Sequence, residues 1–472
     1  MQRSFMPDTQ LHNLKAELIG QPEHMPPPQV SESALDVTLL TREAFVSDVQ
    51  SVLERTEEPE YVRAATHFAE ICAPLIQHVP QFTDLVIPFL TPEETAITRI
   101  YWTNIRGHRC VNRVYSVVYS TCRGPAHGPL DFIEDITMAS AKIHAKQQTL
   151  LSALSQALVG GGYTAIDLDF HGLEDADKDL FAAAFATTFL AKQHRFVQFY
   201  PGATATRTDF ARLYGHSHRL TDSEVIPRPD TTYGSILDPG DYRGIGGVIA
   251  FDLLYSRDHD GIKGLTTLVL GRPDAVKAAA EELIRRKALP LLYPIDNGVV
   301  ADTRGFTADR LKELKKGRVQ YVNSNATATF YLNPPTDIIA DAVITLGPRP
   351  MTNEVLTGFL HTGTRCIVEA EKIFTSAQHA AIRESGAFLA PPQLAGLGAI
   401  IVQNMAIEQR QNVLALTVEH VNNRIETVLR AGIGQCHETI REYELDDNDF
   451  YSAATINAFQ NTATALFQQG TQ

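Results

Sequence analysis

The stretch from Leu151 to Phe170, LSALSQALVGGGYTAIDLDF, joins an apolar helical run, three glycines and a strand-like run. Glycines such as Gly160–Gly162 occur where the backbone must approach another group closely or turn with positive φ. A reactive loop would carry an acid, a base or a phosphate-binding lysine here, but Tyr163 follows the glycines. Its unperturbed pKa of about 10 makes a tyrosine a poor base near neutrality. The spacing therefore predicts a glycine loop without reactive chemistry of its own.

Two histidines in the run Gly215–His218 are further residues whose type suggests ligand binding. They stand two positions apart with no third ligand nearby, whereas a zinc site needs three or four protein ligands. We therefore expect a surface loop here and no metal site. The five cysteines are widely spaced and form no CxxC pair, which argues against a disulfide framework and favours a reducing compartment.

The composition is that of a folded globular protein. Of the 472 residues, 44% are hydrophobic and 20% are charged, a balance that argues against disorder. The formal net charge of −14 disfavours nucleic acid as a partner, because a phosphate backbone requires a basic face. No apolar run approaches the roughly 18 residues that a membrane-spanning helix needs. We therefore expect neither a nucleic acid nor a transmembrane segment.

The elements that would position these residues begin with a mixed α/β region. Residues 1–40 are rich in proline and resemble an extended arm. Periodicity predicts helices over 40–78, 135–158 and 174–192. Alternation and β-branched content predict strands over 97–105, 111–120 and 165–169.

The remainder of the chain alternates strands with helices. A passage rich in turn residues, 227–247, looks like an interdomain hinge. Strands are expected beyond it at 265–270, 289–293, 337–346, 364–368 and 387–390. Such alternation predicts a parallel, doubly wound sheet. Residues 397–469 are almost wholly helical in pattern.

Several motifs, in order, resemble those of glutamate dehydrogenases and related amino-acid dehydrogenases. Residues 123–132, RGPAHGPLDF, resemble the RGPxKGGxRF element, and the family's helix with its GGGKGG loop falls without a gap on 151–165. The segment 367–376, IVEAEKIFTS, resembles VVEGANxPTT, and 390–403 resembles the PDxLANAGGV stretch. The similarity extends over roughly 45–470 with the family's spacing.

The resemblance implies an α/β, two-domain amino-acid dehydrogenase fold, with an α/β N-terminal domain and a Rossmann-like doubly wound second domain. The N-terminal domain would bind substrate and mediate oligomerisation. On this basis the chain divides into an arm (1–40), a first domain (41–225), a second domain (226–415) and C-terminal helices returning to the first domain (416–472).

The family performs its chemistry with three lysines and one aspartate, and the resemblance implies that all four are replaced. The lysine positions fall on His127, Leu151 and Tyr163, and the aspartate position falls on Ala203. A family arginine falls on Asp131. Losing a single acid–base group typically costs roughly 10²–10⁴ in rate. We therefore expect no deamination by the family mechanism.

The dinucleotide turn is also altered in the resemblance. A dinucleotide fingerprint needs three glycines, but the sequence LGRPDAV retains only Gly271. Pro273 and Val276 stand at the other two positions, and Lys372 replaces an asparagine expected to face the nicotinamide. Asp296 is interpreted as a turn residue before Asn–Gly rather than a ribose contact. We therefore expect no cofactor.

The sequence thus favours a catalytically inactive member of this family, retained as a structural or scaffold subunit. Its partners would be other protein subunits or further copies of the chain, bound through the first domain. The expected compartment is the mitochondrial matrix side, within a larger complex, or the cytoplasm. The alternative is a divergent amino-acid dehydrogenase or a small-ligand sensor that uses the interdomain cleft, lined by His127, Lys372 and Tyr163.

Overall fold

The computed structural model describes residues 41–190, 197–220, 237–257, 259–347, 351–412 and 416–470. The predicted arm, 1–40, lies outside the described residues, as does most of the predicted hinge. Within the described ranges, no helix has the length and apolar character that crossing a membrane requires.

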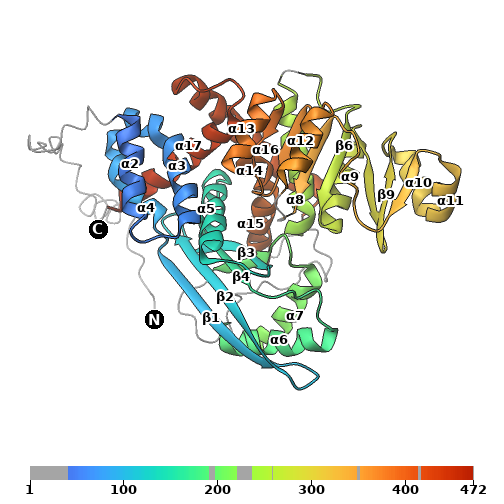
Figure 1. Cartoon of the computed structure of the whole chain (residues 1–472), viewed down its shortest axis with the longest axis horizontal. Helices are drawn as coiled ribbons and strands as arrows, with labels where there is room; N and C mark the ends of the chain where they lie inside the picture. The colour runs from blue at the N-terminus through green and yellow to red at the C-terminus, as the bar shows by residue number, and fades with distance from the viewer. Residues whose placement is uncertain are drawn as a thin grey trace, which may run out of the picture. The chain divides into compact units, whose positions relative to one another are not determined.

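The first part of the chain forms a five-stranded sheet with the order β1-β2-β4-β3-β5 (Figure 1). The strands are β1 (Glu94–Thr103), β2 (Arg109–Ser120), β3 (Ala126–Phe132), β4 (Gly160–Ile166) and β5 (Gln198–Pro201). Neighbours β1, β2 and β4 pair antiparallel, whereas β3 pairs parallel with β4 and β5. This sheet confirms the mixed α/β first domain.

Helices cover both faces of this sheet. On one face lie α3 (Pro59–His78) and α5 (Met138–Leu154), and on the other lie α6 (Asp175–Thr188) and α7 (Arg207–Ser217) (Figure 1). Two shorter helices, α2 (Arg42–Leu53) and α4 (Thr83–Leu90), pack beside α3, with a 3-10 turn (Pro80–Phe82) before α4. The two histidines expected in a surface loop instead stand at the end of α7, where His218 is the C-cap.

The predicted glycine loop is in fact the buried strand β4. Gly160, Gly161 and Gly162 all lie in this strand, none of them with positive φ. A Cβ on Gly161 would overlap the backbone of Thr149 in α5, and one on Gly162 would lie 2.6 Å from Val197 Cγ2. The expectation of a loop is therefore wrong, because these glycines serve close packing between strand and helix.

The second part of the chain is built on a five-stranded sheet of order β13-β12-β11-β6-β7. Its strands are β6 (Thr266–Gly271), β7 (Leu289–Pro290), β11 (Ala342–Leu346), β12 (Cys366–Glu369) and β13 (Phe388–Ala390). All neighbouring pairs are parallel. The intervening helices include α9 (Pro273–Arg285), α12 (Asn353–His361) and α13 (Ser376–Glu384). The expected Rossmann-like parallel sheet is confirmed.

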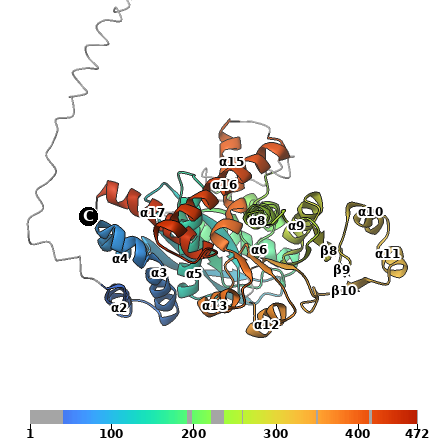
Figure 2. The same cartoon turned by 90° about the horizontal axis from the view of Figure 1, so that it is seen from above.

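A small antiparallel sheet, not anticipated from the sequence, follows β7. It has the order β10-β9-β8, with β8 (Leu292–Ile295), β9 (Gly298–Asp302) and β10 (Ala328–Tyr331). Helices α10 (Ala308–Lys316) and α11 (Arg318–Ser324) lie beyond this sheet, away from α5, in both views (Figures 1 and 2). Asp296 stands in the hairpin turn between β8 and β9, next to Asn297 with φ 61°, as the turn interpretation predicted.

The expected hinge at 227–247 is partly wrong. Residues 221–236 lie outside the described residues, but Pro239–Tyr255 forms helix α8. Asp238 caps this helix by accepting a hydrogen bond from Gly240 N at 2.8 Å. A Cβ on Gly246 would lie 2.6 Å from Gly398 Cα, so a glycine here permits close helix packing rather than a turn.

The C-terminal region is helical, as expected. It comprises α14 (Pro392–Ala395), α15 (Leu397–Asn412), α16 (Val418–Glu442) and α17 (Phe450–Gln469). Helix α17 packs against α3, where the rings of Phe459 and Phe68 lie 5.4 Å apart. The boundaries proposed for the domains stay predictions.

Candidate functional site

The four positions assigned to the family's reactive residues are all buried. His127 lies on β3, Leu151 on α5 and Tyr163 on β4, while Ala203 follows β5. Their exposed fractions are 3%, 6%, 1% and 4%, respectively. Sequence reasoning therefore located four neighbouring elements, but not an open site.

Tyr163 is held within the first domain by polar and stacking contacts. Its hydroxyl donates a hydrogen bond to Asp131 Oδ2 at 3.2 Å, and its ring stacks on His144 with centroids 4.8 Å apart. Burial, with the adjacent Asp131 carboxylate, raises the pKa of Tyr163 well above its usual range. The hydroxyl therefore stays protonated near neutrality and serves as a hydrogen-bond donor.

A carboxylate still stands beside Ala203, although it comes from a different strand. Asp131 Oδ1 accepts hydrogen bonds from Thr204 N at 2.7 Å and Thr204 Oγ1 at 2.8 Å. A Cβ on Gly202 would overlap this carboxylate. An acid therefore lies beside Ala203, and it comes from the position that the resemblance assigns to a family arginine.

His127 does not provide a cation. Burial lowers the pKa of this imidazole to about 4, so the ring is neutral at pH 7. Its Nδ1 atom has no hydrogen-bond partner among the described residues. A charged anion-binding role for His127 is therefore unfavourable.

The cleft beside Leu151 is nearly closed. Arg243 of α8 forms an ion pair with Glu371 at 3.2 Å, and Tyr200 donates to Gln148 Oε1 at 2.6 Å. The void that these side chains line with Leu151 measures about 20 Å³. That volume suits a water molecule rather than an amino acid.

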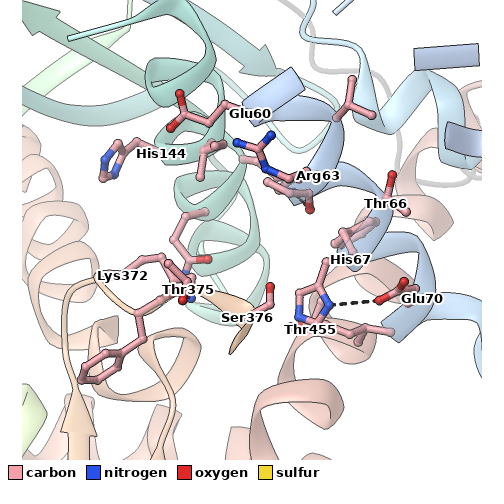
Figure 3. Close-up of a pocket in the computed structure, with 18 of the residues that line it drawn as sticks. Glu60, Arg63, Thr66, His67, Glu70, His144, Lys372, Thr375, Ser376 and Thr455 are labelled. Atoms are coloured by element: carbon pink, nitrogen blue, oxygen red, sulfur yellow. Dashed lines mark hydrogen bonds and ion pairs between the residues drawn. The ribbon is translucent and has the colours of Figure 1, made fainter. Parts of the chain in front are cut away.

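A much larger cavity of about 1100 Å³ adjoins this void and shares Gln147 and Lys372 with it. Its walls come from α3, α5, the segment 372–377 and α17. Figure 3 shows Glu60, Arg63 and His67 on the α3 side, with Lys372 facing them across the space. We call this space the lysine cavity, because Lys146 and Lys372 both line it.

Lys146, on α5, is the buried cation of the lysine cavity. Its side chain is 7% exposed, and Nζ donates a hydrogen bond to Ala64 O at 2.9 Å. The ammonium also lies 5.2 Å from the Phe68 ring centroid. Burial, followed by the positive charge of Lys372, lowers its pKa to about 7, although Cys72 acts in the opposite direction. Near neutrality Lys146 can therefore both accept and donate a proton.

Lys372 is positioned by a buried acid. Glu369 is fully buried and accepts hydrogen bonds from Ile373 N and Phe374 N, each at 2.7 Å. Its other oxygen lies 2.7 Å from His379 Nε2. Lys372 Nζ lies 3.8 Å from Glu369 and donates to the carbonyl of Phe374. These contacts hold the segment around Lys372 in place, and so they position its ammonium at the cavity wall.

The positive charge of Lys372 and the neighbouring His379 also decide the ionisation of Glu369. Burial alone would raise the pKa of Glu369, but the Lys372 and His379 charges and the hydrogen bonds from His379 and Phe374 N bring it below its usual range. The carboxylate therefore remains ionised in the folded protein.

The turn after β6, expected to bind a dinucleotide, is filled by its own side chains. Arg272 forms an ion pair with Asp274 at 2.7 Å and also hydrogen-bonds to the carbonyl of Ala205. Asp274 Oδ1 accepts from Ala275 N at 2.9 Å in the first turn of α9. A pyrophosphate normally occupies such a helix N-terminus, so here it would meet a carboxylate.

The other positions of this turn also argue against a bound pyrophosphate. Pro273 begins α9 and offers no amide hydrogen, while Val276 is 4% exposed. Gly271 has φ +153° and is required by packing, because a Cβ would lie 2.7 Å from Leu346 Cβ. As arranged in this structure, the turn does not fit a dinucleotide in the usual way.

Two features of the site were missed from the sequence. Lys146 and Gln147 stand five and four residues before Leu151 on α5; both line the lysine cavity, and Gln147, one helical turn from Leu151, also lines the void. Helical spacing could have suggested Gln147. The low pKa of Lys146 depends on burial by α3, which the sequence does not specify.

Comparison with known proteins gives a consistent family assignment. Residues 234–470 match the family model described as Glutamate/Leucine/Phenylalanine/Valine dehydrogenase, and residues 92–195 match the Glu/Leu/Phe/Val dehydrogenase, dimerisation domain. The NADP-specific glutamate dehydrogenase of Giardia intestinalis is 22% identical over 87% of this chain and 95% of its own length. That of Chlorella sorokiniana is 24% identical over 88% and 82%, respectively.

Solved structures share the fold. The crystal structure of Plasmodium falciparum glutamate dehydrogenase superposes with a TM-score of 0.79 at 20% identity, covering 91% of this chain and 96% of that one. The expected two-domain amino-acid dehydrogenase fold is thereby confirmed.

The prediction of an inactive scaffold subunit is wrong by the same comparison. The relatives that match nearly the whole chain are named as glutamate dehydrogenases, so they indicate an enzyme. The prediction considered only what replaced each family residue at its own position. It did not consider Lys146, an ionisable group that the fold brings to the lysine cavity from another position.

Proposed function

The chain belongs to the Glu/Leu/Phe/Val dehydrogenase family, and from this premise we propose that it is an enzyme acting on a small amino acid or 2-oxo acid bound in the lysine cavity. The relatives' names support oxidoreduction between an amino acid and its oxo acid as the reaction class. The observation that carries the proposal is the pair of lysines, Lys146 and Lys372, lining one 1100 Å³ cavity beside the family cleft.

The two lysines would have different roles. We assign to Lys372 the binding of the substrate carboxylate, which would join Glu369, 3.8 Å away, and the Phe374 carbonyl as acceptors of its ammonium. Lys146 has a pKa of about 7, which suits transfer of protons to and from the amino nitrogen or water.

A nicotinamide dinucleotide would supply hydride transfer in the family, as the relatives' names indicate. The β6–α9 turn does not fit its pyrophosphate as arranged, because Asp274 occupies the helix N-terminus. The electron acceptor is therefore varied in the experiment below.

We also propose that the protein assembles with further copies of itself through the first domain. The support is the match of residues 92–195 to the family's dimerisation domain. Mass measurement of the native protein in solution tests this, and a monomer at micromolar concentration would contradict it.

The test of activity is oxo-acid formation by the full chain. Amino acids including glutamate are supplied with NADP, NAD or a tetrazolium dye, and the oxo acid is quantified. We expect turnover that falls about 10²–10⁴-fold in Lys146→Met, the usual cost of losing an acid–base group. Lys142→Met is the matched control, since Lys142 is ion-paired with Glu57 one turn away. Absence of oxo acid with every acceptor would contradict the proposal.

A further inference from the structure

Lys146 is buried without an acidic partner. In the described ranges, no carboxylate lies within ion-pair distance of its Nζ, which donates to the Ala64 carbonyl and lies over the rings of Tyr61 and Phe68. An ammonium offers three hydrogens, so one donated hydrogen bond leaves two of them without a hydrogen-bond acceptor. The group is therefore available to a ligand.

Lys142, one turn earlier on the same helix, shows the contrast. It lies within hydrogen-bonding distance of Glu57, and it does not line the lysine cavity. Its charge is thus already compensated within the protein. Of these two lysines on α5, only Lys146 combines burial with access to the cavity.

The surroundings of Lys146 favour its neutral amine. Burial against α3 disfavours the charged form, and the Lys372 ammonium on the cavity wall adds to this effect. A lysine that is desolvated, or next to another cation, is the kind that attacks carbonyl carbon.

We propose that Lys146 is a nucleophile that forms a Schiff base with the carbonyl carbon of a 2-oxo acid whose carboxylate Lys372 binds. This inference rests on the proposed binding of such an acid in the lysine cavity. The cavity of about 1100 Å³ provides room for a small oxo acid between the two lysines.

The step balances without an oxidant or a reductant. The lone pair of neutral Lys146 Nζ forms the C–N bond while the C=O π pair moves to oxygen, which takes a proton. The nitrogen then releases its extra proton, the hydroxyl takes a second proton and leaves as water, and the nitrogen lone pair forms the C=N bond of a protonated imine. Water reverses the step, releasing the oxo acid and the amine.

The test traps this imine in the full-length protein. Pyruvate and sodium cyanoborohydride are added without any nucleotide, and the protein is then digested and its peptides are weighed. We expect the peptide containing Lys146 to gain the mass of pyruvate less one oxygen atom. Modification spread evenly over surface lysines, or no modification at Lys146, would overturn the proposal.

Two variants sharpen the result. Lys146→Arg keeps the positive charge but removes the nucleophilic amine, so the adduct at that peptide should be lost. Lys142→Arg should retain it. The peptide map of the treated wild-type protein locates the adduct directly. It therefore tests the Schiff base even if Lys146→Arg fails to fold.

The trapping result and the activity result are separable. Trapping needs neither nucleotide nor electron acceptor, so an adduct at Lys146 without turnover would support the Schiff base and contradict the proposed oxidoreduction. Turnover without an adduct would overturn the Schiff base alone.

Discussion

The void at Leu151 and the lysine cavity share Gln147 and Lys372, yet they differ in how their polar groups are satisfied. Around the void, Arg243 is paired with Glu371, which leaves about 20 Å³. In the cavity of about 1100 Å³, Lys146 has one hydrogen bond and no acidic partner among the described residues.

This difference distinguishes polar groups that are bonded within the protein from polar groups that are available to a ligand. A buried polar group with protein partners contributes to the fold, whereas one that lacks partners is costly unless a ligand or water satisfies it. On this criterion we place the proposed site in the lysine cavity, whereas the four positions that match the family's reactive residues are buried. The following predictions test the contrast, beginning with the largest expected effect.

Removing the acid that fixes the cavity wall should have the largest effect on stability. Glu369→Ala leaves His379 without its partner and removes the acceptor of two backbone amides. We expect the free energy of unfolding to fall by about 3–5 kcal/mol, as for breaking a buried ion pair. Denaturant unfolding measures it. The matched control is Glu384→Ala on the exposed side of α13, which should change the value by less than about 0.5 kcal/mol.

The closely packed contact between β4 and α5 should not tolerate added side-chain volume. Gly161→Ala would place a methyl group against the Thr149 backbone, so we expect a loss of about 1–3 kcal/mol in the free energy of unfolding. Gly215→Ala in α7 is the control, because a Cβ there meets no other atom within 4 Å. It should be neutral or stabilising by up to about 1 kcal/mol. Equal effects of the two changes would show that β4 is not closely packed against α5.

The pH dependence of stability tests the buried lysine. The pKa of Lys146 is lowered to about 7 from 10.5, with Lys372 and Cys72 as its charged or titratable neighbours. Between these values the unfolded chain binds a proton that the folded chain lacks, so folding stability rises with pH. The slope is up to about 1.4 kcal/mol per pH unit.

Thermal or denaturant unfolding between pH 7 and 10 measures this slope as a difference between the wild type and Lys146→Met. The subtraction removes the contributions of other titrating groups. A difference that does not change with pH would show that the Lys146 amine is solvated rather than buried.

The fold followed from the sequence more completely than the site did. The strand-and-helix alternation after Leu265 and the ordered family motifs predicted the parallel sheet, because apolar periodicity is local. Residues 239–247, the first part of α8, were included in the expected hinge because their glycines resemble turn residues. Only contact with α15 shows that one of them, Gly246, permits helix packing.

By itself the sequence determined the family, the two kinds of sheet and the replacement of lysine by His127, Leu151 and Tyr163. Tertiary structure decided which groups are buried, which are paired and which line a space. It placed Asp131 beside Ala203 and left Lys146 without an acidic partner in the described part of the chain. The physical reason is that charge, pKa and access depend on desolvation and on neighbours distant in sequence, as α3 and segment 372–377 are from α5.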